Sequence, residues 1–399
     1  MRTICLVSCV KTKLNKTAAA KDLYTSALFT KNANYADAIS DKWFILSAKH
    51  GLLDPEDVID TYNETLSKVS VSARKEWSHK VYLQLLPLLK SGDSVIFLAG
   101  ENYREHLVPL LENIRVNVQV PMRGLSFGNQ LKWLNLKLRE IETNKNVDKF
   151  YELITYLENG LSGKKRVSEL EGKCLPSKGL YLFFEDSELR KLNNELRVTR
   201  VGTHGVSMGS KSTLWNRIKT HKGKHDLGGN HRGSIFRLHI GNAIINKNCS
   251  RQQYPSWGVG QSAGKDITID ENDLEIEVSR YIGQMKLLWL SISDASGPTS
   301  DRAYLEKNII GLLSQSSEPI DPPSADWLGN YSLKDVIKKT GLWNLDHVGF
   351  KYDQRFLGVL EEYIEVTLGN RSTPSTSIAP TDWKKRSNSA KSKQLTFWE

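Results

Sequence analysis

Three short stretches carry side chains that could act together on a phosphate group. The stretch SKGLYLFF places Tyr181 in an apolar run typical of a strand, and a second run of this kind, RVTRVGTHG, follows it. The stretch STLWNRIKTH places Arg217 and His221 four residues apart, which puts both on one face of a helix. A phenol, a guanidinium and an imidazole in one place could hold a phosphodiester and move the protons that its hydrolysis requires.

These stretches resemble the GIY-YIG nucleases, whose small sheet displays two tyrosine motifs beside a helix that carries a cation. The letters GLY ending at Tyr181 stand at the first motif, whereas the second motif begins at Arg200 and reads RVG, without its usual tyrosine. The resemblance implies that Tyr181 acts as general base or orients the water, that Arg217 holds the scissile phosphate, and that His221 assists proton transfer.

The same resemblance implies a metal ligand on a later helix. We expect RAYLEKNIIGLL to be amphipathic and helical, and Glu306 within it stands where the family has its metal-binding glutamate. A single glutamate suits Mg²⁺, which binds through few carboxylates and keeps several waters. The asparagine that the family has after this glutamate is not evident, and Asp321 is the nearest substitute.

A basic stretch follows the Arg217 helix. HKGKHDLGGNHRGSIFRLHIG is interpreted as a glycine-rich loop followed by a strand, with Lys222 and Arg232 placed to contact the phosphates of a DNA strand.

The first 128 residues alternate short apolar runs with helical stretches, which indicates an α/β domain with a mostly parallel sheet. The predicted strands are TICLVSC, KWFILSA, DSVIFLAG and NVQVPM. Ligands bind at the carboxyl ends of the strands in such a sheet, so polar residues there are candidates for binding a base and its phosphate. They are Ser8, Cys9, Lys11, Lys49, His50, Glu101, Asn102, Tyr103 and Arg123, with Tyr24 as a second stacking aromatic.

The stretches SCVKTK, AKDLYTSALF and WFILSAKHGLLDPEDVIDTYNETL resemble a prokaryotic domain of unknown function. That domain is related to the base-handling domains of archaeosine synthases and to YaaA-like proteins, and it is similar to the uracil-DNA glycosylase fold. The resemblance implies a site for a modified or flipped base. If the base is excised, Glu101, Asn102 or Asp54 would be the catalytic group.

The predicted architecture is therefore an α/β chain in four parts. Residues 1–145 form a base-recognition domain with an open, mostly parallel sheet flanked by helices. Residues 146–175 form a helical linker, and residues 176–368 form a smaller α+β domain of the GIY-YIG type with C-terminal helices. Residues 369–399 are rich in Ser, Thr, Pro and Lys and are expected to be a disordered basic tail.

Composition agrees with a nucleic-acid partner. The 399 residues include 55 Lys and Arg against 45 Asp and Glu, and the formal charge of +10 attracts polyanions. The four cysteines have no CxxC spacing, so neither a zinc knuckle nor a disulfide framework is indicated and a cytoplasmic location is expected. No apolar run approaches the ~20 residues that cross a bilayer.

The chain ends in KSKQLTFWE, which resembles the short peptides that dock on sliding clamps. Clamp binding would concentrate the protein on replicating DNA. The residues concerned are Gln394, Leu395, Phe397 and Trp398.

These features together favour a DNA-acting defence enzyme, in which a glycosylase-like domain recognises or excises a modified base in phage DNA. Its fused module would be a Mg²⁺-dependent nuclease, and no cofactor is expected for the N-terminal domain. One alternative is a modification-dependent endonuclease whose first domain only senses the base. Others are a DNA-binding protein without catalysis, or an accessory factor for tRNA modification.

Overall fold

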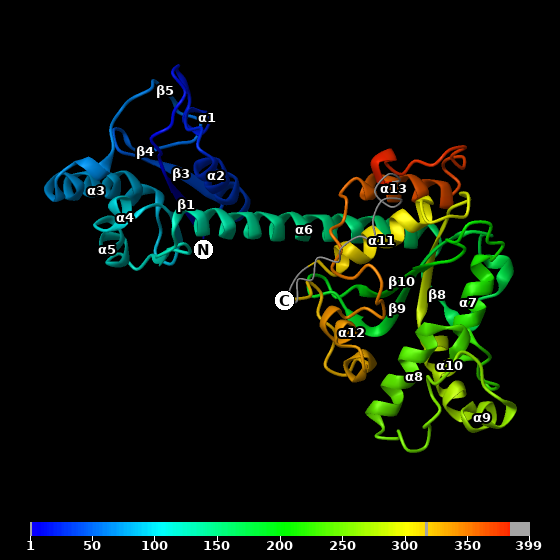
Figure 1. Ribbon diagram of the computed structural model, residues 1–399. Coiled ribbons are helices and arrows are strands. Elements are labelled where there is room, and N and C mark those ends of the chain that lie inside the picture. The colour runs from blue at the N-terminus through cyan, green and yellow to red at the C-terminus, as the bar shows by residue number, and fades with distance from the viewer. Residues whose placement is uncertain (1, 316–317, 384–399) are drawn as a thin grey trace. The chain divides into compact units, whose positions relative to one another are not determined.

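The computed structural model describes residues 2–315 and 318–383, which divide into two compact units (Figure 1). The first unit is Met1–Glu142 and the second is Thr143–Glu399. The predicted clamp-binding residues, Gln394, Leu395, Phe397 and Trp398, lie outside the described residues.

The first unit is built on a five-stranded sheet of order β4-β3-β1-β6-β7. β1 runs parallel to β3 and β6, β6 runs parallel to β7, and only the pairing of β4 with β3 is antiparallel. The strands are β1 (Thr3–Ser8), β3 (Lys42–Ser47), β4 (Gly51–Leu53), β6 (Ser94–Leu98) and β7 (Asn117–Gln119), while β2 (Ala18–Ala19) and β5 (Val58–Ile59) form a separate pair. The predicted α/β class and the four predicted strands are thus confirmed.

Both faces of this sheet are covered by helices, because its strands are apolar on both sides. Phe29 on α2 packs on one face with Cys5 and Val7 of β1, and Trp77 on α3 packs on the other. The helices of this unit are α1 (Ala20–Leu23), α2 (Ala27–Ile39), α3 (Val71–Leu85), α4 (Glu101–Arg104) and α5 (Leu107–Glu112).

The long helix α6 (Phe127–Gly160) belongs to both units. Its first part contributes Leu134 to the core of the first unit, and its last part contributes Phe150 and Leu157 to the core of the second. The stretch 146–175, predicted as a linker, therefore begins inside a packed core, and its GKKR segment forms the edge strand β8 (Lys165–Arg166).

The second unit is built on an antiparallel sheet of order β10-β9-β11-β8. Its other strands are β9 (Gly179–Leu189), β10 (Leu196–Thr203) and β11 (Lys286–Ser291). Its helices are α7 (Leu214–Lys222), α8 (Ile235–Lys247), α9 (Lys265–Asp270), α10 (Asn272–Gln284), α11 (Asp301–Leu313), α12 (Asp335–Thr340) and α13 (Phe356–Thr367).

Alternation along β9 sends its side chains into two separate cores. Leu180 and Leu182 pack with α6, α11 and α13, whereas Tyr181 and Phe183 pack with α7, α8 and α10 (Figure 1). Tyr181 therefore packs in a core with side chains of α7, α8 and α10, and not in the core to which α11 contributes.

The prediction of a strand after the basic loop is wrong. That segment is the helix α8, whose first turn is capped by the Ser234 hydroxyl accepting from the N–H of Arg237. Phe236, Ile240 and Ile244 are buried at helical spacing, so the period of the apolar residues is close to four and not two. The run SIFRLHIG is too short to separate the two periods by eye.

Part of the predicted tail is packed. Ile378, Ala379 and Trp383 lie against the core formed by α11 and α13, and the N–H of Ile378 donates to the carboxylate of Asp301 at 2.9 Å. Residues 369–383 therefore include ordered contacts with the second unit, contrary to the expectation of disorder.

Candidate active site

Tyr181 occupies a space that the neighbouring strand leaves open for it. Its side chain is fully buried on β9, and its partner across β10 is Gly202. A Cβ atom on Gly202 would lie 2.3 Å from the hydroxyl oxygen of Tyr181, closer than real contacts come. The glycine of the second motif is therefore required by the tyrosine of the first.

Tyr181 is hydrogen-bonded to His221. The motifs that contain these two residues predicted that their side chains lie close together. The Tyr181 hydroxyl lies 2.9 Å from Nε2 of His221, and Nδ1 of the same imidazole lies 2.7 Å from the hydroxyl of Ser234. Burial lowers the pKa of His221 well below its ordinary value, and the charges of Arg200 and Arg217 lower it further. The imidazole is therefore neutral at physiological pH.

A neutral imidazole leaves two arrangements of protons. If His221 carries its proton on Nδ1, it donates to Ser234 and accepts from the Tyr181 hydroxyl at Nε2. If the proton is on Nε2, His221 donates to the Tyr181 oxygen and accepts from Ser234. Either way the phenol has a partner that can take up or return a proton.

Arg200 replaces the tyrosine expected in the second motif and lies in the same site. Its guanidinium lies 4.4 Å from the centre of the Phe236 ring and donates to the carbonyl oxygen of Trp343 at 2.9 Å. Burial lowers the pKa of Arg200, whereas the negative charges of Tyr181 and Glu306, when they are ionised, raise it. Its Nε has no hydrogen-bond partner within the described residues, so one donor remains open.

Glu306 reaches this edge of the sheet from α11, which packs on the opposite face. Its Oε1 accepts a hydrogen bond from the backbone N–H of Thr203 at 3.1 Å. Burial and, as a smaller cause, the charge of Asp346 raise the pKa of Glu306 to about 7, although Arg200 and the Thr203 N–H oppose this. The carboxyl group is thus balanced between its two protonation states near neutral pH.

Arg217 has an open guanidinium beside these groups. It is half-buried on α7, and among residues 2–315 and 318–383 its side chain forms no hydrogen bond or ion pair. Its charge nevertheless lowers the pKa of both His221 and Glu306, so it lies within electrostatic reach of both. An unpaired guanidinium in this position is available to an anionic ligand.

The edge of β10 explains how groups from both faces meet. The carbonyl of Thr199 accepts from the N–H of Trp343, and the side chain of Asn344 bonds both backbone groups of Val201. The next outward-facing N–H, that of Thr203, is the one that Glu306 holds. The strand edge is therefore covered, as exposed edges in folded proteins usually are.

The structure does not bring Asp321 to this site. Asp321 pairs with Arg190 at 3.1 Å and accepts from the N–H of Lys191, which leaves it within a structural ion pair. The residues that the structure does place beside Glu306 and β10 are Asn344 and Asp346. They are about 40 positions along the chain from Glu306, and the sequence offered no spacing that would have indicated them.

A divalent cation here would be held chiefly by Glu306. No group of three or more His, Cys, Asp or Glu side chains suited to a metal ion occurs in the described part of the chain. Oε2 of Glu306 has no hydrogen-bond partner in that part, and Asp346 supplies a second negative charge nearby. Because Mg²⁺ needs only one or two carboxylates and retains water ligands, these residues fit it.

The side chains of Lys222 and Arg232 both bind acceptors within the second unit. Nζ of Lys222 donates to the carbonyl oxygens of Ser168 and Leu170 at 2.7 and 3.2 Å. Arg232 forms a buried ion pair with Glu271 at 2.5 Å. Neither cation is open to a phosphate in this structure, in contrast to Arg217.

The first unit gathers a second set of polar side chains at the carboxyl ends of β1 and β3. Tyr62 lies at its centre, with its hydroxyl 2.6 Å from that of Tyr24 and 2.7 Å from that of Ser47. The ammonium groups of Lys13 and Lys49 lie 4.3 and 5.8 Å from the centre of the Tyr62 ring. We call these five residues the Tyr62 cluster.

Three further predicted residues adjoin the Tyr62 cluster. The ring of His50 meets that of Tyr62 edge-on at 5.4 Å, and the thiol of Cys9 lies 3.2 Å from the hydroxyl of Tyr103. Burial raises the pKa of Tyr24 to about 12, so its phenol keeps its proton. Tyr62 and Lys13 were not predicted as site residues, although they lie in the stretches WFILSAKHGLLDPEDVIDTYNETL and SCVKTK.

The remaining predicted residues of the first unit have no contact with the Tyr62 cluster among the interactions of the described residues. Glu101 pairs with Arg104 one turn along α4, and Asp54 pairs with Lys42 at 3.3 Å. Ser8 ends β1 and Asn102 lies in α4, both half-buried, while Lys11 and Arg123 are exposed.

Comparison with known proteins assigns the second unit. Residues 141–369, more than half of the chain, match a family described as "GIY-YIG domain". The chain belongs to the GIY-YIG domain family. The resemblance seen in the separate motifs therefore extends over most of the second unit, and it supports a nuclease module there.

The first unit matches a family for which no function is described. Residues 4–136 match the "Family of unknown function (DUF6884)". A protein of Bacillus subtilis (strain 168), "Uncharacterized protein YfjM", is 27% identical over 120 residues, which cover 27% of this chain and 75% of that protein. No solved structure matches the chain. The described residues include no helix long and apolar enough to span a membrane.

Proposed function

We propose that the second unit hydrolyses phosphodiester bonds of DNA at the site formed by Tyr181, Arg217 and Glu306. The observation that supports the proposal is that Arg200 interacts with both Tyr181 and Glu306, and Arg217 with both His221 and Glu306. At this site a phenol is backed by a neutral imidazole, a guanidinium has no partner among the described residues, and a carboxylate has one open oxygen. These are the groups that such a reaction uses.

Each side chain has a role that follows from its surroundings. The Tyr181 oxygen orients or deprotonates the attacking water, because His221 can exchange a proton with it away from solvent. Arg217 binds the non-bridging oxygens of the scissile phosphate. Arg200 stabilises negative charge on Tyr181 and Glu306. A bound Mg²⁺ would supply Lewis-acid stabilisation of the phosphate at Glu306.

We further propose that the Tyr62 cluster binds a nucleobase together with its phosphate, and that it directs cleavage to DNA with particular modified bases, such as phage DNA. Lys13 and Lys49 have no ion pair in the described part of the chain, so both can neutralise a phosphate. Tyr62 offers a ring and a hydroxyl at the carboxyl ends of parallel strands, where ligands of such sheets bind.

Base sensing fits the geometry of the first unit better than base excision. Excision requires a carboxylate or amide at the sugar, yet Glu101 and Asp54 each form an ion pair. Asn102 remains the candidate if excision occurs, since no partner holds its side chain in the described residues.

One experiment separates these functions. The full chain is incubated with Mg²⁺ and matched DNA substrates containing cytosine or hydroxymethylcytosine, and with tRNA, and both strand breaks and free bases are measured. Cleavage of the modified DNA without released base supports a base-sensing nuclease. Released base would assign excision to the first unit. Binding without breaks on every substrate would remove the nuclease proposal, and preference for tRNA would indicate a role in RNA modification.

A further inference from the structure

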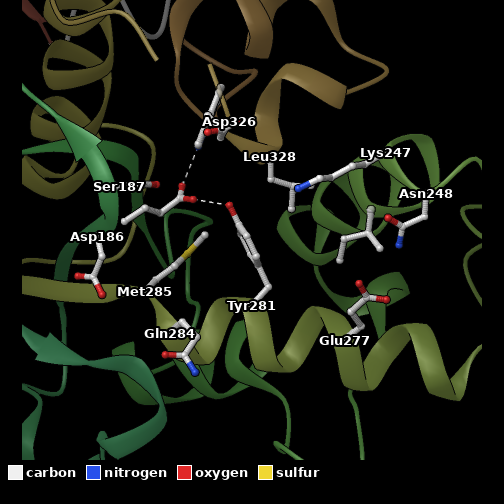
Figure 2. Close-up of a pocket in the computed structure, with 13 residues that line it drawn as sticks. Asp186, Ser187, Lys247, Asn248, Glu277, Tyr281, Gln284, Met285, Asp326 and Leu328 are labelled. Carbon is white, nitrogen blue, oxygen red and sulfur yellow. Dashed lines mark hydrogen bonds between the residues drawn. The ribbon is translucent and has the colours of Figure 1, made fainter. Parts of the chain in front are cut away.

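A pocket of about 400 Å³ lies at the other end of β9 from the active site (Figure 2). Glu185, one of its lining residues, is four positions beyond Tyr181, about 13 Å along the strand. None of the proposed nuclease residues lines this pocket. Its walls come from the ends of β9, α8 and α10 and from the segment that leads into the short helix η6 (Leu328–Tyr331).

The floor of the pocket is apolar and aromatic. Trp327 and Met285 are buried there, together with Ile244 and Leu328, and the half-buried ring of Tyr281 forms one wall. Figure 2 shows Tyr281 and Met285 lying beside each other below Asp326. Pockets of this volume with an apolar lining are typical of small-molecule sites.

A buried carboxylate without a countercharge lies at the inner end. Glu185 is 7% exposed, and its Oε1 accepts hydrogen bonds from the indole N–H groups of Trp327 and Trp343, both at 3.0 Å. Its Oε2 accepts from the hydroxyl of Tyr281. All three donors are neutral, and Glu185 forms no ion pair within the described residues. Buried carboxylates normally have a cationic partner, so this one can attract a cation from outside.

The mouth of the pocket is also negative. Glu277 on α10 and Asp326 are exposed, and neither forms an ion pair in the part of the chain described. Asp186 is the third acid at the rim, although Lys286 and Arg166 already pair with it. Lys247 is the one cation among the lining residues. This local excess of acids is unusual in a chain with a formal charge of +10.

We propose that this pocket binds an organic cation, an amine or guanidine carried on a small apolar or aromatic body. The apolar body would pack on Met285 and on the face of Tyr281, whose π electrons also attract cations. The charged head would lie between Glu277, Asp326 and the inner carboxylate of Glu185. A phosphate would be repelled by the same acids, so the pocket does not extend the DNA site.

The ligand could be a free amine or a basic side chain of the chain itself. Residues 384–399 contain five Lys and Arg together with Phe397 and Trp398, so they carry the same chemistry. The experiment therefore includes this segment as a separate competitor.

The test measures binding of 2-phenylethylamine to the full chain by calorimetry, with 2-phenylethanol as the uncharged probe of the same shape. We expect the alcohol to bind at least about tenfold more weakly, the effect of losing one charge-assisted contact. The variant Glu277→Gln/Asp326→Asn changes only exposed acids and should weaken amine binding by a similar factor. The exposed Asp270→Asn serves as the control.

Equal binding of the amine and the alcohol, or unchanged amine binding by the double variant, would overturn the proposal. If a peptide of residues 384–399 displaces the amine, the cation is supplied by the chain itself; if it does not, a free amine is the ligand. The inference is independent of the nuclease proposal, because the double variant should cleave DNA as the unaltered chain does.

Discussion

The hydroxyl of Tyr181 lies 2.9 Å from Nε2 of His221, and both side chains are buried. The imidazole is itself held by Ser234, and its low pKa keeps it neutral. The phenol therefore has a fixed proton partner on one side. Arg200 and Arg217 lie within electrostatic reach of His221, and Glu306 lies within reach of both arginines. This relationship connects the fold of β9 and α7 to the chemistry that we propose.

Gly202→Ala should abolish cleavage because a Cβ atom there meets the Tyr181 hydroxyl oxygen at 2.3 Å. The phenol must move, and its hydrogen bond to His221 is lost with it. We expect cleavage to fall by about 100-fold or more and unfolding free energy to fall by about 1–3 kcal/mol. Gly358→Ala is the matched control, since a Cβ atom at that helical position meets nothing within 4 Å. Unchanged cleavage by Gly202→Ala would contradict this role for Tyr181.

Arg217→Ala should impair cleavage more than binding. Its guanidinium stabilises charge that develops on the phosphate, so kcat should fall by about 100-fold while the affinity for DNA changes less than tenfold. Lys219→Ala removes an exposed cation from the same helix and should leave kcat nearly unchanged. Single-turnover cleavage and filter binding measure the two effects. If both variants lose the same activity, Arg217 contributes only general surface charge.

Much of this site follows from the sequence, but its assembly does not. The motif around Tyr181 and the spacing of Arg217 and His221 indicate a strand and a helix, because local periodicity determines both. Asn344 and Asp346 were not predicted, since their positions depend on how β10 closes its edge against a distant segment. Lys222 and Arg232 were expected to contact DNA, whereas their acceptor partners lie 24–54 residues away in sequence.

The first unit shows the same limit. Its parallel strands were evident from continuous apolar runs, and the rule that ligands bind at strand ends indicated Cys9, Lys49 and Tyr103. Tyr62 was missed because it lies in a loop after β5 and not at a strand end. Only the folded chain places its hydroxyl beside Ser47.

Stability should fall in mild acid because two buried histidines accept protons only at a lower pH than they would in the unfolded chain. Burial lowers the pKa of His239 and His204 to about 4, whereas an unfolded histidine has its ordinary value of 6.5. Between pH 6.5 and about 4 the unfolded chain thus binds more protons, and stability decreases as the pH falls through that window. Each such group contributes at most about 1.4 kcal/mol per pH unit.

His239→Gln should reduce this pH dependence by one proton, measured by urea unfolding at several pH values. Nε2 of His239 has no hydrogen-bond partner among the described residues, so the exchange disturbs few contacts. His225→Gln, at an exposed position, should leave the slope unchanged. A slope that is the same for His239→Gln and the unaltered chain would show that His239 does not contribute to it.

Lys13→Ala and Lys49→Ala should each weaken binding of a short single-stranded oligonucleotide by the first unit's site. We expect about a tenfold loss of affinity for each, since each removes one charge-assisted contact to phosphate. Lys75→Ala on α3, an exposed position, is the control. The measurement uses the full chain carrying Arg217→Ala, so that cleavage does not consume the ligand. Equal affinities across all three variants would contradict the proposed role of the Tyr62 cluster.

The most direct test of the proposed active site is plasmid nicking by the full chain and by Glu306→Gln, with and without Mg²⁺. We predict nicking that requires Mg²⁺ and falls by about 100-fold or more in Glu306→Gln, because the amide keeps the bond from the Thr203 N–H but loses the charge that holds the cation. Glu361→Gln on α13, at an exposed carboxylate, should nick as the unaltered chain does. Nicking by Glu306→Gln at the rate of the unaltered chain, or undiminished nicking in the presence of a chelator, would contradict the account.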